Sequence, residues 1–175
     1  VGTYTITYTF TDGNGCENTV TDDIEVFDLP TVSFSAPADL CIDAGVQAGL
    51  GGGTPTGGTY SGPGVTDDGN GSTYSFDPSV AGVGVHTIIY TFTDGNGCEN
   101  TATDNIEVFD LPTVSLTLGD DEACVDETSV ALTGGSPVGG TYSGPGVTGS
   151  TFDPSSVGVG TYTITYTFTD GNGCE

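Results

Sequence analysis

Strict alternation of apolar and polar residues marks the start of the chain. Residues Thr3–Thr11 read TYTITYTFT, which places Tyr, Ile, Tyr and Phe on one face of an extended strand and Thr on the other. The next residues, Asp12–Gly15, read DGNG, a sequence that closes β-hairpins. The run Asn18–Phe27 follows, with Ile24 and Val26 on one parity. The pattern therefore predicts a half-buried β-hairpin.

Short strands separated by Gly- and Pro-rich turns are predicted along the rest of the chain. They fall at Thr31–Ser35, Val46–Leu50, Gly58–Ser61 and Thr73–Phe76. About seven such strands in roughly 80 residues, with no helical period, are typical of a β-sandwich. The predicted fold is all-β, built from tandem immunoglobulin-like antiparallel β-sandwiches.

The chain repeats its own sequence. Residues Val1–Glu17, VGTYTITYTFTDGNGCE, recur letter for letter at Val159–Glu175, and the variant VGVHTIIYTFTDGNGCE occupies Val83–Glu99. The cysteines of the three GNGC motifs are spaced by 98 − 16 = 82 and 174 − 98 = 76 residues. The identity across 159 − 1 = 158 residues indicates a higher-order repeat that alternates a long and a short domain.

The repeats divide the chain into three predicted parts. Residues 1–28 are the last two strands of a preceding repeat, residues 29–110 are a complete long repeat, and residues 111–175 are a short repeat without its final strand. That strand, expected to resemble Asn18–Asp28, would come from continuation of the chain or from a neighbouring molecule.

The charge is entirely of one sign. The 175 residues include 24 acidic side chains and no Lys or Arg, for a formal charge of −24. Nucleic acids and anionic membrane surfaces are excluded as partners, because both are bound through Lys and Arg. Each carboxylate is expected to be solvated, hydrogen-bonded or neutralised by an external cation.

The five cysteines are interpreted as disulfide formers in an oxidising compartment. Pairing within each repeat joins Cys41 to Cys98 and Cys124 to Cys174, and leaves Cys16 for an upstream or neighbouring copy. A bond between adjacent domains is the alternative. It stays open because the loop after the first strand and the final hairpin turn lie at opposite poles of a standard sandwich.

Calcium is the one cofactor that the sequence suggests, because hard cations prefer oxygen ligands. The candidate ligands lie where repeats join and in the insert of the long repeat: Asp22, Asp23, Glu25, Asp28, Asp67, Asp68, Asp104, Glu107 and Asp110. The DGNGCE motif lacks the spacing of an EF-hand loop. The alternative is that these residues are turn formers and solvated charges.

No catalytic constellation is recognised, and the chain is predicted not to be an enzyme. The single histidine, His86, occupies the position of Tyr4 and Tyr162 in the other copies, on the inward parity with Ile88 and Tyr90. A nucleophile and an orienting acid would have to converge on it for catalysis. His86 is therefore interpreted as a packed aromatic residue.

The motifs GTYSGPGV, FDPS, YTFTDGNGC and IEV together resemble the Ig-like or PKD-like tandem repeats of large secreted surface proteins and adhesins of Bacteroidetes, of the gliding-motility-associated type. The resemblance implies secretion to the bacterial cell surface and a role in adhesion or filament formation, with neighbouring identical repeats as partners. The favoured hypothesis is an extracellular structural repeat that forms a stalk or filament by end-to-end stacking. The alternative is an adhesin module that binds a glycan or protein through its loops.

Overall fold

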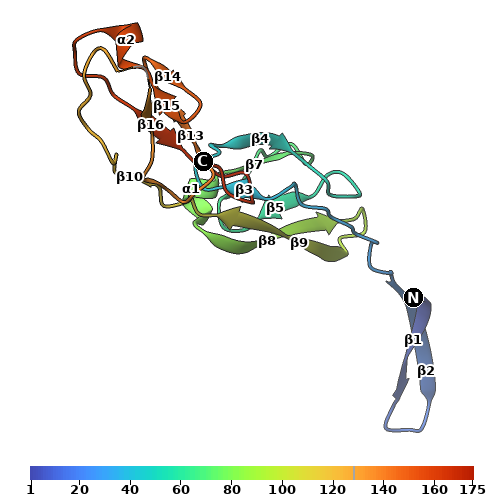
Figure 1. Ribbon diagram of the computed structural model, residues 1–175. Helices are drawn as coiled ribbons and strands as arrows, with labels where there is room; N and C mark the ends of the chain where they lie inside the picture. The colour runs from blue at the N-terminus through green and yellow to red at the C-terminus, as the bar shows by residue number, and fades with distance from the viewer. Residues whose placement is uncertain (128) are drawn as a thin grey trace. The chain divides into compact units, whose positions relative to one another are not determined.

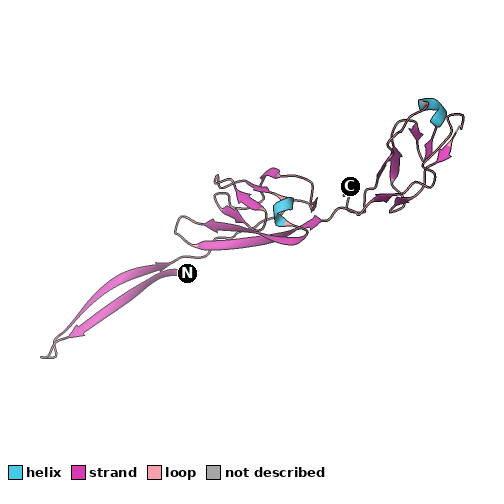
Figure 2. Ribbon diagram, turned by 90° about the vertical axis from the view of Figure 1, so that its left-hand side faces the viewer, coloured by secondary structure: helices cyan, strands magenta, loops and turns pink. Residues whose placement is uncertain are grey.

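The chain is all-β in a computed structural model, which describes residues 1–127 and 129–175. Its strands are short apart from two long hairpin pairs, and its two helices, α1 (Pro78–Ala81) and α2 (Pro154–Val157), have four residues each (Figures 1 and 2). The strands are β1 (Gly2–Thr11), β2 (Glu17–Val26), β3 (Leu40–Cys41), β4 (Gln47–Leu50), β5 (Thr59–Ser61), β6 (Val65–Asp67), β7 (Tyr74–Phe76), β8 (Gly84–Thr93), β9 (Glu99–Phe109), β10 (Ser115–Leu116), β11 (Val130–Ala131), β12 (Gly135–Ser136), β13 (Thr141–Ser143), β14 (Val147–Thr148), β15 (Thr151–Phe152) and β16 (Thr165–Thr167).

The chain divides into two compact units, which are described separately. Unit 1 comprises residues 1–38, 46–81 and 85–106, and unit 2 comprises residues 39–45, 82–84 and 107–175. Strand β9 begins in unit 1 and ends in unit 2.

The predicted N-terminal hairpin is present as β1 and β2, drawn in blue in Figure 1. The two strands pair antiparallel from Gly2 opposite Val26 to Thr11 opposite Glu17, and they form a two-stranded sheet of their own. The prediction of half-burial is wrong for this copy. No second layer covers its apolar face in the described structure, so Tyr4, Ile6, Tyr8 and Phe10 are all exposed.

The core of unit 1 lies between two sheets. One contains β5, β8 and β9, within the order β3-β9-β8-β5, and the other has the order β4-β7-β6. Alternation along β8 buries Ile88 and Tyr90 and leaves Val85 and Thr87 exposed, so the predicted parity holds in this copy. The fully buried side chains of unit 1 include Tyr74, Phe76, Ile88, Tyr90 and Ile106.

Tyrosine rings pack against one another at the centre of this core. Tyr60 and Tyr90 are paired residues of β5 and β8, and their ring centroids lie 4.7 Å apart. Tyr74 from the other sheet packs against Tyr60 at 4.5 Å. The two sheets of unit 1 therefore pack together through aromatic contacts, and each ring buries a large apolar area.

A buried tyrosine hydroxyl also fixes the loop that precedes β5. The Tyr90 hydroxyl accepts the backbone N–H of Gly58 at 2.9 Å and donates to the carbonyl of Pro55. A Cβ at Gly58 would lie 2.5 Å from the Tyr90 ring, so only glycine fits there. Unit 2 repeats the arrangement with Gly140, Tyr166 and Pro137.

Unit 2 has smaller sheets, of order β11-β15-β14, β13-β16 and β10-β12. Its strand β16 has three residues, whereas the corresponding β8 has ten. Val108, Val130, Leu132 and Cys174 are its buried apolar residues among those described. The core of unit 2 is therefore less complete than that of unit 1.

Some local predictions differ from the structure. Thr31–Ser35 is not a strand, and Ser33 makes only an isolated bridge to Thr54. The short helices were not predicted. They begin at the FDPS motif, where the Asp77 carboxylate caps the backbone N–H of Ser79 at 2.9 Å and proline occupies the first helical position.

Candidate functional site

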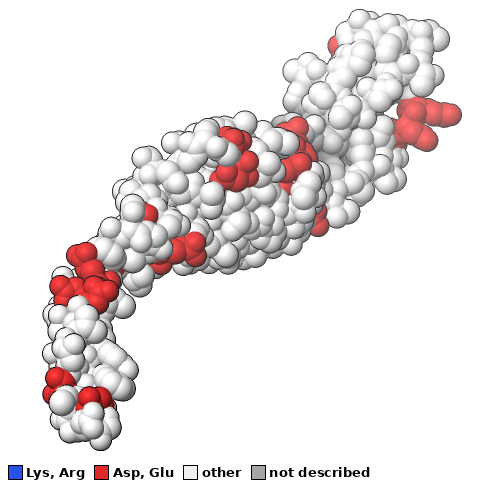
Figure 3. Space-filling view, turned by 180° about the vertical axis from the view of Figure 1, so that it is seen from behind, with Lys and Arg blue, Asp and Glu red and all other residues white. Residues whose placement is uncertain are grey.

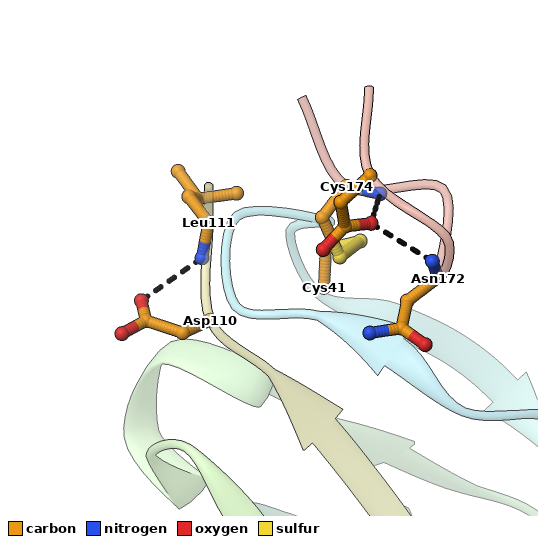
Figure 4. The surroundings of a disulfide bond; sticks show 6 residues. Cys41, Asp110, Leu111, Asn172 and Cys174 are labelled. Carbon is orange, nitrogen blue, oxygen red and sulfur yellow. Dashed lines mark hydrogen bonds between the residues drawn. A yellow bond between two sulfur atoms is a disulfide. The ribbon is translucent and has the colours of Figure 1, made fainter. Parts of the chain in front are cut away.

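The candidate site is built from two kinds of cysteine-bearing turn, and the first is the DGNGC turn. In the last copy the Asp170 carboxylate accepts the backbone N–H groups of Asn172 and Cys174, both at 2.9 Å (Figure 4). A backbone bond from Asp170 N–H to the Cys174 carbonyl, also 2.9 Å, closes the turn. One aspartate therefore fixes the backbone that presents the cysteine.

All three copies of this turn have the same conformation. Asp12 and Asp94 bind the corresponding N–H groups at the same 2.9 Å distances. The glycine before each cysteine has φ of 85°, 83° and 87° at Gly15, Gly97 and Gly173, a region that disfavours other residues. The N–H groups of Cys16 and then Asn14 lower the pKa of Asp12, because they stabilise its ionised form.

The second kind of turn carries Cys41 and follows β3. Strand β3 pairs in parallel with the end of β9, with Leu40 opposite Val108 and Cys41 opposite Phe109. The Asp39 carboxylate accepts the N–H of Glu107 at 2.8 Å and strengthens this pairing. Cys41 is thus held beside the last residue of β9, within unit 2.

These two turns meet in a disulfide bond between Cys41 and Cys174 (Figure 4). Their Cα atoms lie 5.6 Å apart, and Cys174 is fully buried. The expected pairs Cys41–Cys98 and Cys124–Cys174 are therefore wrong in this structure. The bond instead joins a cysteine of the predicted repeat 29–110 to a cysteine of the predicted repeat 111–175, and both cysteines lie in unit 2.

Strand length explains the correction. Cys98 immediately precedes β9, whereas Cys41 lies beside Phe109 at the other end of that strand. Eleven extended residues span roughly 35 Å, and a disulfide needs Cα atoms within about 7 Å. Pairing of Cys41 with Cys98 is thus excluded by the register of β3 on β9.

The other cysteines carry free thiols in the described part of the chain. Cys16 and Cys124 are exposed, and Cys98 is partly exposed. Cys124 begins a turn like that of Cys41, since Glu127 N–H donates to the Cys124 carbonyl at 3.0 Å and Ala44 N–H donates to the Cys41 carbonyl at 3.0 Å. The described residues therefore contain repeated copies of both turns but a single disulfide bond between them.

The calcium candidates near the strand pairs act as hydrogen-bond acceptors. Asp23 accepts the hydroxyl of Thr5 at 2.7 Å, and Asp104 accepts the N–H of Ala36 at 2.9 Å. The Ala36 N–H, followed by that of Asn105, lowers the pKa of Asp104. Asp22, Asp28 and Asp110 each accept the N–H of the next residue, Glu25 lies opposite Thr3 on β2, and Glu107 lies on β9.

The candidates in the insert stabilise its loop. Asp67 accepts N–H groups of Tyr60 at 2.7 Å and Gly69 at 2.8 Å, and Asp68 accepts the hydroxyl of Thr73 at 2.5 Å. No group of three or more His, Cys, Asp or Glu side chains placed to hold a metal is found among the residues that the structure describes. On the face shown in Figure 3 the acidic side chains lie in several separate groups. Calcium binding stays a prediction.

A cleft of about 450 Å³ opens into the core of unit 2. Its apolar lining includes Leu118, Val130, Leu132, Phe152, Tyr162 and Ile164. In unit 1, Ile88, which corresponds to Ile164, is fully buried in the same core as Ile106. The sequence did not predict a cleft of this size in the core of unit 2.

His86 lies on β8 and is partly buried, on the parity of Ile88 and Tyr90 as predicted.

None of the described helices is long and apolar enough to cross a membrane. Comparison of the chain with protein-family models and with curated proteins gives no match.

Proposed function

We propose that this chain is an extracellular structural repeat, which forms a bacterial cell-surface stalk or filament from β-sandwich domains in series. The observation that carries the proposal is the Cys41–Cys174 disulfide, because it covalently ties one sequence repeat to the next. The near-identity of the repeats supports the same conclusion, since a spacer needs uniform units rather than divergent loops.

The disulfide also supports the proposed location. Such bonds persist in oxidising compartments such as the bacterial cell surface. The resemblance of the repeat motifs to surface proteins of Bacteroidetes points to the same place. A binding module is less well supported, because the DGNGC turn is uniform in three copies and one of them is used in the disulfide.

The mechanical consequence of the bond can be worked out from its position. A pulling force transmitted along the chain passes from Cys41 to Cys174 through the two sulfur atoms. The residues between them are therefore shielded from the force as long as the bond is intact. The two cysteines are 133 positions apart in the sequence, which corresponds to about 450 Å of extended chain.

Single-molecule force spectroscopy tests this proposal. The oxidised 175-residue chain, held at its two ends, should extend about 450 Å less than the reduced chain or the Cys41→Ser variant. A Cys98→Ser variant is the matched control and should behave like the unaltered chain. Equal extension of the oxidised and reduced chains would show that Cys41 and Cys174 are not joined in the oxidised chain, and the structural function would lose the observation that carries it.

A further inference from the structure

We propose that Cys98 forms a second disulfide with Cys124 of a preceding copy of this sequence. The proposal rests on the proposed function, because it requires copies that follow one another in series. It assigns a covalent site between copies to two thiols that are free in the described part of the chain.

The observed bond gives the rule for pairing. Cys41 is the early cysteine of its repeat, at the end of β3, and Cys174 is the DGNGC cysteine of the repeat that follows. The early cysteine of each repeat thus bonds the DGNGC cysteine of the next. Applied along the series, this rule pairs Cys98 with the early cysteine of the repeat before it. It pairs Cys124 with the DGNGC cysteine of the repeat after it.

The turns that carry Cys98 and Cys124 repeat backbone hydrogen bonds of the turns that carry Cys174 and Cys41. In the turn that carries Cys98, the Asp94 carboxylate accepts two backbone N–H groups at 2.9 Å. The Asp170 carboxylate does the same in the turn that carries Cys174. Cys124 begins the same kind of turn as Cys41, each with a 3.0 Å backbone bond three residues on. Cys98 is also partly exposed, and Cys124 is exposed.

The sequence identifies the partner as a copy of this chain. Residues Val1–Glu17 are identical to Val159–Glu175, so the repeat before residues 29–110 carries the hairpin of the short repeat. The early cysteine of the short repeat is Cys124. Cys98 therefore bonds Cys124 of the preceding copy, and not Cys124 of its own copy, which belongs to the following repeat.

The chemistry needs an oxidant of the disulfide class, such as oxidised glutathione or a disulfide-bearing oxidoreductase. The thiolate of one cysteine attacks the oxidant's disulfide, forms a mixed disulfide and releases one thiol. The second cysteine then attacks the mixed disulfide, forms the Cys98–Cys124 bond and releases the second thiol. Two thiols lose two protons and two electrons, and the oxidant's disulfide gains them.

The first arm of the test supplies both copies in one polypeptide. In this polypeptide, residues 18–175 of a second copy follow Glu175 of the first. Residues 159–175 of the first copy then serve as residues 1–17 of the second, because the two segments are identical. The tandem chain carries Cys98→Ser in the first copy and Cys124→Ser in the second, so that each of the two cysteines occurs in one copy alone. After oxidation with glutathione disulfide, mass spectrometry of peptides cut at Asp and Glu should find Cys124 of the first copy bonded to Cys98 of the second. Trypsin is unsuitable, since the chain has no Lys or Arg. A Cys124 peptide that stays reduced, or that is bonded elsewhere, overturns the proposal.

The second arm asks whether separate copies can supply the two cysteines. In a Cys16→Ser background, the Cys98→Ser variant and the Cys124→Ser variant should each stay monomeric under oxidation. Their mixture should give a dimer that dithiothreitol reverses. A mixture without dimer restricts the bond to copies in one polypeptide, provided that the first arm finds it. Dimers of either variant alone contradict the pairing rule.

Failure of this proposal is distinguishable from failure of the proposed function. The force experiment concerns Cys41–Cys174 within one copy, and its control is the Cys98→Ser variant. The oxidised single copy could extend less than its reduced form while the tandem chain shows no Cys98–Cys124 bond. That pair of results would keep the structural function and reject the covalent link between copies.

Discussion

The two units carry the same motifs but bury them to different extents. In unit 1 the rings of Tyr60 and Tyr90 pack in a core that also holds the fully buried Ile106. In unit 2 the corresponding rings of Tyr142 and Tyr166 pack at 4.8 Å, yet both are only partly buried, and a cleft of about 450 Å³ lies open.

The difference follows from the last strand of the repeat. Ile106 and Val108 of β9 are 0% and 1% exposed, whereas the same residues in the first copy, Ile24 and Val26, are 54% and 43% exposed. The sequence around them is nearly identical, so burial depends on what packs against the strand and not on the strand itself. A complete repeat needs both its early strands and its final strand.

The largest expected effect comes from giving unit 2 that strand. Adding the sequence of residues 18–28 after Glu175 should fill the cleft with an Ile and a Val side chain. Full burial of two such side chains contributes about 3–6 kcal/mol to the free energy of unfolding of unit 2. Urea denaturation, with hydrogen exchange to locate the protected amides, measures the gain. The same extension with Asp at the copies of Ile24 and Val26 is the control, and an equal gain would contradict the packing explanation.

The reverse experiment removes the same contact from unit 1. Ile106→Ala should destabilise unit 1 by about 2–5 kcal/mol, because it leaves a cavity in a closed core. Ile24→Ala, at the equivalent exposed position of β2, should change stability by less than about 0.5 kcal/mol. The denaturant midpoints of the two variants measure these losses. Equal destabilisation by Ile106→Ala and Ile24→Ala would contradict the role of packing.

Much of the fold was predictable from local sequence. The hairpins, the turns that close them and the strands near Val46–Leu50 and Gly58–Ser61 follow from alternation and from Gly and Asn at turn positions. The burial of the β8 face was predicted for Ile88 and Tyr90 and is observed. These features depend on residues close to one another along the chain.

The disulfide was not predictable in the same way. It depends on the parallel pairing of Leu40 with Val108, two residues far apart in the sequence, and a two-residue strand leaves no periodic pattern. The position of the two turns at opposite poles of a standard sandwich left a bond between adjacent domains open as the alternative. Only the register of β3 on β9 decides between the two pairings.

A smaller contrast concerns the tyrosine hydroxyls. Tyr90→Phe should destabilise unit 1 by about 1–3 kcal/mol, because it leaves the buried Gly58 N–H without its acceptor. Tyr74→Phe should be neutral or stabilising by about 1 kcal/mol. The Tyr74 hydroxyl is buried with no hydrogen-bond partner in the described structure, and burial raises its pKa to about 12. Thermal denaturation measures the stability of both variants. An equal loss of stability in the two would contradict the hydrogen-bonding difference between the Tyr90 and Tyr74 hydroxyls.

The smallest expected effect is a pH dependence that separates two copies of one aspartate. Asp104 accepts the N–H of Ala36, which lowers its pKa in the folded state, whereas Asp22 accepts only the N–H of the adjacent Asp23 among the bonds described. A carboxyl with a lowered folded pKa stabilises the fold above its unfolded pKa of about 4. That stabilisation is lost as the pH falls through the folded pKa.

Unit 1 should therefore lose stability on acidification from about pH 5 to about pH 2.5, and part of the loss should depend on Asp104. Asp104→Asn should reduce the difference between the urea midpoints measured at the two pH values, and Asp22→Asn should leave it unchanged. The residue is exposed, so solvent screening keeps the effect small. If the two variants showed the same acid response, the contact between Asp104 and Ala36 would not account for the lowered pKa.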